Sequence, residues 1–154
     1  MNPVRSLNFG RKQSPGSGKK ATFNSRTSNG VNLVDSCGWI EFFTDGPLAE
    51  EYFKHLRDPS NLITPSIIVY EVYKIIKRER TEEEALIAVA QIGKTRIILL
   101  TQKLALEAAD YSLQYRLPMA DAIVYATGVA GKAKIISSDP HFENLPFVLF
   151  IPKK

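Results

Sequence analysis

Short apolar runs alternate with longer amphipathic segments over most of this chain, from Val31 to its end. The strand-like runs fall at residues 31–34, 62–65, 96–100, 134–137 and 147–151, where β-branched, aromatic and other apolar residues gather. Segments with helical spacing lie between them, at residues 38–43, 47–56, 66–80, 82–92, 103–115 and 119–131. Strands that alternate with helices pair in parallel and carry the helices on the faces of the sheet. The sequence therefore predicts an α/β fold with a parallel sheet.

The length of 154 residues suits one domain with a hydrophobic core of its own. No apolar run reaches the roughly 18 residues that a membrane helix needs, so we expect no contact with a membrane. The N-terminus is basic, but no apolar segment follows it, so we do not expect a signal peptide. The single cysteine, Cys37, cannot form an internal disulfide. These features fit a protein of the reducing cytoplasm.

The basic charge of the chain is concentrated at its N-terminus. Residues 1–30 hold six of the 20 basic residues and none of the 16 acidic ones, so the remaining 124 residues carry a net charge of −2. Ser, Gly, Asn, Lys and Arg dominate this segment, which is typical of a disordered tail. One interpretation is a basic arm that touches RNA or DNA, and the other is a native start at Val31. We expect residues 1–30 to stay outside the core and residues 31–154 to form the domain.

Four acidic residues stand where a parallel sheet would gather them. Asp35 and Asp139 follow two of the apolar runs, Asp121 comes three residues after Pro118 in the first turn of a predicted helix, and Glu71 interrupts an apolar helical stripe. The carboxyl ends of parallel strands meet at one edge of the sheet, where ligands bind in open α/β folds. Carboxylates held together repel one another unless a cation joins them, and oxygen ligands suit Mg²⁺ or Mn²⁺. The pattern predicts a metal-dependent enzyme that acts on phosphates.

Each acid also has a purely structural interpretation. Asp35 and Asp139 are common residues for a helix N-cap and for a turn. Asp121 complements the dipole of the helix that it begins. Glu71 has an edge position with access to solvent as its alternative, because an unpaired carboxylate facing the core is strongly unfavourable. The joint placement of all four favours a site over coincidence.

Other common sites are missing from the sequence. His55 and His141 lack the Cys or His neighbours of a zinc site. The chain has neither of the usual glycine-rich phosphate loops. The run at residues 96–100 does not end in Asp, which argues against a receiver domain. An α/β binding module whose acids are structural is the main alternative from outside the enzymes.

With the four acids placed, the chain resembles a PIN-domain ribonuclease of the VapC toxin type. The motifs that carry the resemblance follow one another in the family's order: Leu33-Val34-Asp35-Ser36-Cys37-Gly38-Trp39-Ile40-Glu41, Ile63-Thr64-Pro65-Ser66 with Tyr70-Glu71-Val72, Leu117-Pro118-Met119-Ala120-Asp121-Ala122, and Ile136-Ser137-Ser138-Asp139-Pro140-His141-Phe142. They cover nearly all of residues 31–154 and leave out the tail. The resemblance implies a three-layer α/β/α fold around a central parallel sheet of four to five strands.

The resemblance also implies the roles of the acids. The family's first-strand Asp falls on Asp35, its helical Glu on Glu71, and its paired late acids on Asp121 and Asp139. The three Asp residues would hold Mg²⁺, or Mn²⁺, while Glu71 orients the attacking water or holds a second ion. The implied activity is hydrolysis of RNA phosphodiester bonds by an endoribonuclease.

Two serines and a cysteine lie beside these acids in the sequence. Ser137 precedes Asp139 by two residues and Ser36 follows Asp35, so we expect both hydroxyls to orient carboxylates. Cys37 departs from the family, since many members carry at this position an Asn that orients its neighbours.

By resemblance, the partners are an RNA substrate, a cognate antitoxin protein and a second copy in a homodimer. A PIN-domain nuclease of RNA processing or decay, with no antitoxin, is the alternative within the family. Five large apolar residues in the first two predicted helices exceed what one face of the sheet needs, so we expect some of them to be exposed at an interface. They are Trp39, Phe42, Phe43, Leu48 and Tyr52.

Overall fold

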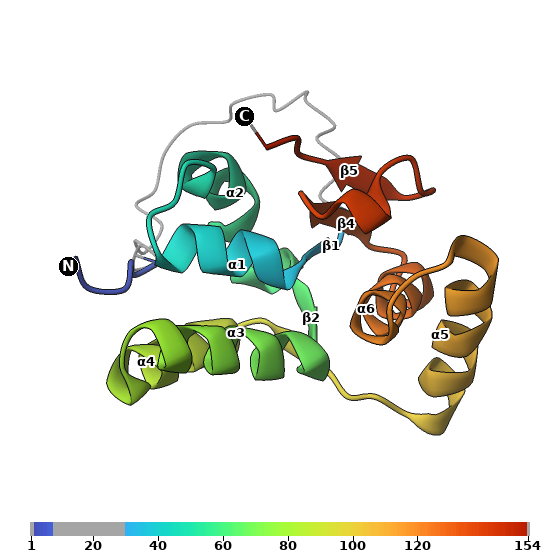
Figure 1. Ribbon diagram of the computed structural model, residues 1–154, viewed down its shortest axis with the longest axis horizontal. Coiled ribbons are helices and arrows are strands. Elements are labelled where there is room, and N and C mark those ends of the chain that lie inside the picture. Colours follow the sequence, from blue (N-terminus) through green and yellow to red (C-terminus); the bar gives the residue numbers. More distant parts are fainter. Residues whose placement is uncertain (1, 8–29, 154) are drawn as a thin grey trace, which may run out of the picture.

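The computed structural model describes residues 2–7 and 30–153, and the strands in this part of the chain are all parallel (Figure 1). The main sheet has the order β1 (Asn32–Val34), β4 (Lys134–Ser137), β5 (Val148–Phe150). Strands β2 (Ile63–Pro65) and β3 (Arg96–Ile98) form a second pair, which a single bridge from Asn32 to Leu62 joins to the main sheet. The predicted α/β fold is confirmed, with three strands in the main sheet rather than four or five.

The helices lie close to their predicted positions and cover both sides of the strands. Figure 1 shows the first four helices on one side and the last two on the other. None of the described helices is long and apolar enough to cross a membrane. In chain order they are α1 (Ser36–Phe43), α2 (Ala49–Leu56), α3 (Ser66–Glu79), α4 (Glu82–Ile92), α5 (Gln102–Tyr115) and α6 (Met119–Ala130), with 3₁₀ turns at Pro59–Asn61 and Pro140–Phe142.

A glycine brings α2 close to α1. A Cβ atom at Gly38 would lie 2.4 Å from the ring of Tyr52, so any other residue would push the two helices apart. Tyr52 is fully buried, and its hydroxyl donates to Ser138 Oγ at 2.9 Å. The contact fixes α2 against the residues that follow β4, beside the carboxyl edge of the sheet.

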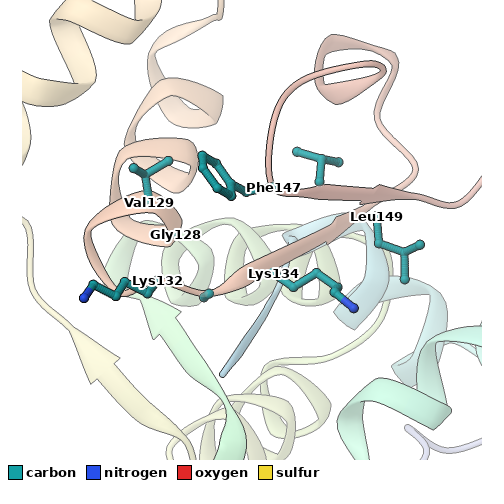
Figure 2. Close-up of a pocket in the computed structure, with 8 residues that line it drawn as sticks. Gly128, Val129, Lys132, Lys134, Phe147 and Leu149 are labelled. Carbon is teal, nitrogen blue, oxygen red and sulfur yellow. The ribbon is translucent and has the colours of Figure 1, made fainter. Parts of the chain in front are cut away.

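A shallow apolar pocket opens at the opposite, amino edge of the sheet (Figure 2). It has a volume of about 450 Å³ and lies between the end of α6, the start of β4 and the residue before β5, Phe147. The strand β4 therefore connects this pocket to the edge where the acids were predicted.

Residues 2–7 pack against the domain, so the prediction that the whole N-terminal segment stays outside the core is wrong for them. Val4 and Leu7 are 8% and 4% exposed. Two apolar side chains three residues apart are enough to attach this segment to the hydrophobic core, which their small number in the sequence did not indicate. Residues 8–29, the rest of the predicted tail, lie outside the described residues.

Hydrogen bonds and a cation fix this segment in place. The side chain of Gln91 accepts from Leu7 N at 2.6 Å and donates to the carbonyl of Arg5 at 3.2 Å, much as a neighbouring strand would. The guanidinium of Arg5 lies 5.1 Å from the centre of the Phe42 ring and 5.6 Å from that of Phe53. The same guanidinium forms ion pairs with two acids, Asp45 and Glu50.

The large apolar residues of α1 and α2 are buried, so the expectation that some are exposed is wrong. Trp39, Phe42, Phe43, Leu48 and Tyr52 are each at most 5% exposed. The two helices fold against each other, and the N-terminal segment covers part of what remains. Five of the exposed large apolar side chains lie on α5 or next to its ends, at Leu99, Leu100, Leu106, Leu113 and Met119.

Candidate active site

Asp35 lies at the end of β1 and caps α1. Its Oδ1 accepts from Ser36 N at 2.8 Å, and its Oδ2 accepts from Ser137 Oγ at 2.9 Å. Burial raises the pKa of Asp35 to about 6, since the side chain is almost inaccessible to water. The two hydrogen bonds oppose this rise, and the charges of Asp121 and Asp139 add to it. The carboxylate is thus held in one orientation and made costly to ionise.

Glu71 lies on α3, half-buried, and faces the same edge of the sheet. Partial burial raises the pKa of Glu71. A hydrogen bond from the side chain of Ser36 opposes the rise, the charges of Asp35 and Asp139 add to it, and Lys74 lowers it slightly. Ser36 therefore contacts two of the predicted acids, with its backbone on Asp35 and its hydroxyl on Glu71.

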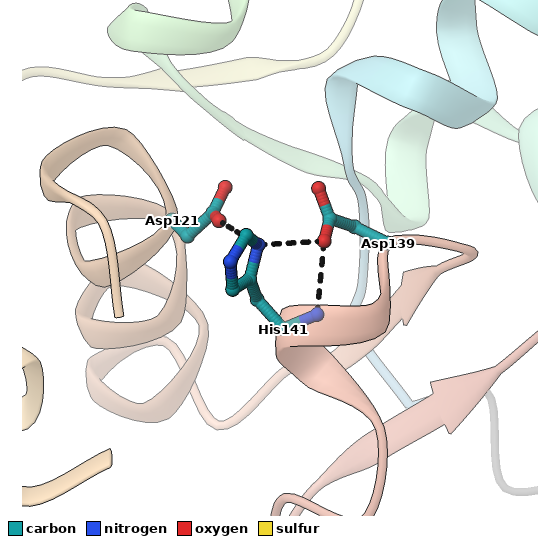
Figure 3. A group of neighbouring side chains, drawn as sticks. All are labelled: Asp121, Asp139 and His141. Atoms are coloured by element: carbon teal, nitrogen blue, oxygen red, sulfur yellow. Dashed lines mark hydrogen bonds and ion pairs between the residues drawn. The ribbon is translucent and has the colours of Figure 1, made fainter. Parts of the chain in front are cut away.

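Asp121, Asp139 and His141 form the tightest group of the site (Figure 3). Each offers one ligand atom, and these atoms lie within 4.8 Å of one another. His141 Nδ1 is 2.9 Å from Asp139 Oδ1 and 3.2 Å from Asp121 Oδ2. Because an ionised carboxylate only accepts hydrogen bonds, a proton on Nδ1 allows the imidazole to donate to these oxygens. Burial, and then the charge of Asp139, raise the pKa of Asp121 to about 6.

The position of His141 follows from the turn that Asp139 begins. Asp139 Oδ1 accepts from His141 N at 2.9 Å, and Asp139 N donates to Ser137 Oγ at 3.0 Å. The short turn thereby folds the imidazole back over its own cap. The sequence pattern Asp-Pro-His was the available signal, but without zinc spacing it gave no reason to choose this histidine.

The structure brings all four predicted acids together at the carboxyl edge. Electrostatic repulsion acts between every pair of Asp35, Glu71, Asp121 and Asp139. Asp35 is not a member of the tightest group, because its oxygens point to Ser36 N and Ser137 Oγ, and His141 takes that place. The predicted supporting hydroxyls, Ser36 and Ser137, both contact acids of the site.

A buried polar network lies behind Asp35. Cys37 Sγ is 3.7 Å from Asp35 Oδ2, 3.5 Å from Ser137 Oγ and 3.6 Å from Tyr52 Oη. Burial, and then the nearby charge of Asp35, raise the pKa of Cys37, so the thiol stays protonated. The neutral Cys37 is therefore a weak donor toward Asp35, and the part of Tyr52 in this network was not predicted.

Residues 33–148 match the PIN domain family. The chain belongs to the PIN domain family. Among similar solved structures are a toxin–antitoxin complex from Klebsiella pneumoniae (TM-score 0.66, 23% identity, 77% of this chain and 95% of that one) and the sarcin–ricin loop cleaving toxin VapC20 of Mycobacterium tuberculosis (0.60, 16%, 71% and 91%). A third is DNA-bound VapBC from Salmonella typhimurium (0.58, 13%, 80% and 98%).

The fold of this PIN domain is thus the fold of VapC toxins, although the low identities show nothing beyond the fold. No curated protein matches the chain significantly. The PIN domain match covers β1 to the start of β5 and excludes the N-terminal segment, so the contacts of residues 2–7 are a feature outside the family's common part.

Proposed function

We propose that this PIN domain is a metal-dependent endoribonuclease, the toxin of a toxin–antitoxin pair. The observation that carries the proposal is the meeting of Asp35, Glu71, Asp121 and Asp139 at one edge of the sheet. A purely structural set of carboxylates has no reason to gather four mutually repelling charges in one half-buried place. The similar solved structures include an RNA-cleaving toxin and toxin–antitoxin complexes, which supports the choice of RNA as substrate.

The residues of the site fit a hard divalent cation such as Mg²⁺ or Mn²⁺. Their ligand atoms are mostly carboxylate oxygens. Burial raises the pKa of Asp35 and Asp121, so their ionised forms are unfavourable in the folded chain, and a bound cation would stabilise these ionised forms. Asp35, Asp121 and Asp139 would hold the ion, which supplies a Lewis acid for the phosphate and an acidified water. The side chain of His141 is 52% exposed and is free to turn away from the two carboxylates.

The remaining side chains of the site would orient the carboxylates and the attacking water and would accept a proton. Glu71 lies at the edge of the group, and its raised pKa suits a group that orients a water and takes its proton. Ser36 holds Glu71, and Ser137 holds Asp35, so that both carboxylates keep their direction toward the phosphate. In this proposal the three Asp residues supply the negative charge that binds the ion, and Glu71 accepts the proton of the water.

We infer that an antitoxin and a second copy of the chain are the protein partners. Two of the similar structures named above are antitoxin-bound, and the exposed apolar residues of α5 offer a face for a dimer. Sedimentation of the purified chain at tens of micromolar, alone and with the product of a neighbouring small gene, tests both. If the chain is a strict monomer and does not bind that product, the alternative function is favoured. That alternative is a cytoplasmic nuclease of RNA processing or decay that has no antitoxin.

Cleavage of purified RNA with Mg²⁺, with Mn²⁺ or with EDTA tests the activity. We expect cleavage with either ion and none in EDTA. Asp121→Asn should remove the activity, whereas Asp110→Asn, the same change at an exposed position of α5, should keep it. Equal cleavage by the two variants, or cleavage that persists in EDTA, would contradict the proposal.

A further inference from the structure

Two pockets adjoin at the amino edge of the sheet, at the far end of β4 from the acids. The apolar pocket of Figure 2 is walled by Val129, Phe147 and Leu149. Beside it lies a polar pocket of about 470 Å³. Lys132 and Lys134 line both pockets, so their ammonium groups stand between an apolar surface and a polar one.

The polar pocket carries an excess of positive charge. Its basic lining residues are Lys54, His55, Arg57, Lys132 and Lys134, against one acid, Asp58. None of the ion pairs within residues 2–7 and 30–153 includes Arg57, Lys132 or Lys134. Burial is the main cause that lowers the pKa of His55; the charge of Glu51 opposes this, and the charges of Lys134 and Lys54 add to it. The excess of lysine and arginine over acid in the lining favours an anion in this pocket.

Hydrogen bonds to the carbonyls of Pro146 and Phe147 hold the backbone at the rim of the apolar pocket, and the Phe147 ring there is exposed. Phe147 is 67% exposed and has a φ of 66°, a left-handed conformation that bulky residues rarely adopt. Its carbonyl accepts from Ile135 N at 2.9 Å, and the preceding carbonyl, of Pro146, accepts from Tyr125 Oη at 3.1 Å. Lys132 also has a positive φ, of 51°. Such conformations persist where the surrounding structure enforces them, often at binding sites.

We propose that this amino edge is a second contact site for single-stranded RNA, with a base stacked on Phe147 and the backbone phosphates bound by Lys132 and Lys134. An exposed ring next to unpaired cations is the combination that binds single strands without reading their sequence. An acidic peptide would use the cations and leave the ring without a role.

The N-terminal segment provides a second observation. Residues 8–29 hold five basic residues and no acidic one, and they rejoin the described chain at Gly30, which lines the polar pocket. The choice of RNA over DNA rests on the proposed function, whereas the site itself rests on the two pockets.

Binding is best measured on the full chain carrying Asp35→Asn, so that bound RNA is not cut. The probe is a fluorescein-labelled 12-residue oligouridylate, followed by anisotropy in EDTA. The test variant adds Lys132→Asn and Lys134→Gln, because asparagine tolerates the positive φ of residue 132. The matched control adds Lys103→Gln and Lys153→Gln, the same loss of charge at other exposed lysines.

The test variant should bind the probe about tenfold more weakly than the control, and its slope of log affinity against log salt should fall by about 0.7 for each lost phosphate contact. Phe147→Asn should weaken binding by about fivefold with an unchanged salt slope, as loss of a stacked base predicts. Equal affinities of test and control variants, with melting temperatures unchanged, would overturn the proposal. Displacement of the probe by polyglutamate as readily as by unlabelled RNA would overturn the stacking on Phe147.

These outcomes are separable from the fate of the proposed function. If the natural chain cleaves no RNA but the variants change binding as described, this RNA site stands and the nuclease assignment falls. If cleavage depends on Asp121 but binding ignores Lys132 and Lys134, the reverse holds.

Discussion

The two edges of the sheet in this protein carry opposite charges in different physical states. At the carboxyl edge, Asp35 and Asp121 are largely buried, repel each other and have raised pKa values. At the amino edge, Lys132 and Lys134 are exposed and have no ion-pair partner among the described residues. The strand β4 joins both edges over roughly 10 Å.

This difference between the two edges explains why the net charge of the domain does not indicate where charged ligands could bind. A balance of −2 over residues 31–154 averages a compact acidic site and an open basic one. Buried charge of one sign needs a counter-ion to be tolerated, whereas exposed charge of the other sign is screened by water and stays available for a partner. The carboxyl edge is therefore suited to metal-dependent catalysis, and the amino edge is suited to binding an anionic partner.

The largest expected effect is on cleavage, and it tests whether the acidic edge acts as one unit. Asp35→Asn, Glu71→Gln and Asp121→Asn should each lower the cleavage rate by about two orders of magnitude or more. Asp110→Asn and Glu79→Gln, the same changes at exposed positions of α5 and α3, should leave it within about twofold of the natural rate. A variant of the first set with near-normal cleavage and a normal melting temperature would remove that residue from the site.

The next effect is on stability against pH, and it tests the state of the buried charges. The pKa values of Asp35 and Asp121 are raised from 3.8 to about 6, so between these values the folded chain holds protons that the unfolded chain releases. Protonation of these carboxyls therefore stabilises the folded chain fully below about pH 4, and this stabilisation is lost as the pH rises through about 6. The loss is about 3 kcal/mol for the buried Asp35 and less for the partly exposed Asp121.

Thermal unfolding in EDTA at pH 4 to 7 measures this loss. Asp121→Asn should flatten part of the decline, and saturating Mg²⁺ should stabilise the natural chain most above pH 6. If the unfolding free energies of the natural chain and of Asp121→Asn change equally with pH, the pKa of Asp121 is not raised in the folded chain.

A third effect tests whether the N-terminal segment is independent of both edges. Leu7→Asp should release residues 2–7 from the helices and cost about 1–3 kcal/mol, because it places a charge at a buried position. Cleavage and its dependence on Mg²⁺ should be unchanged, since the contacts of the segment lie away from the four acids. Urea unfolding and a cleavage assay of the variant and of Asn2→Asp, an exposed control, check both statements.

The smallest effect concerns Glu71 alone. In EDTA, Glu71→Gln should raise the free energy of unfolding by about 0.5–1 kcal/mol, because it removes one charge that Asp35, Asp121 and Asp139 repel. Glu79→Gln should give no gain, since Arg78 pairs with that carboxylate. A lower melting temperature for Glu71→Gln in EDTA would show that its hydrogen bond with Ser36 outweighs the repulsion.

Sequence periodicity alone located nearly every strand and helix of the domain, within a few residues at each end. Local spacing determines secondary structure, and alternation of the two types determines a parallel sheet. The same order placed Asp35 and Asp139 after strands, so their meeting at one edge was predictable from connectivity. The metal-binding and catalytic roles of these acids stay predictions.

Tertiary packing decided the rest, because it depends on contacts between residues far apart in the chain. Gln91 and the aromatic rings of α1 and α2 give residues 2–7 a surface that composition could not reveal, and Trp39 is buried although the sequence predicted exposure in this group. Only the turn after β4 aims His141 at Asp121, and only the pairing of β4 with β5 sets Phe147 beside Lys134. The sequence by itself determined which charges the chain carries and at which strand ends; folding decided which of them are buried together and which remain open to solvent.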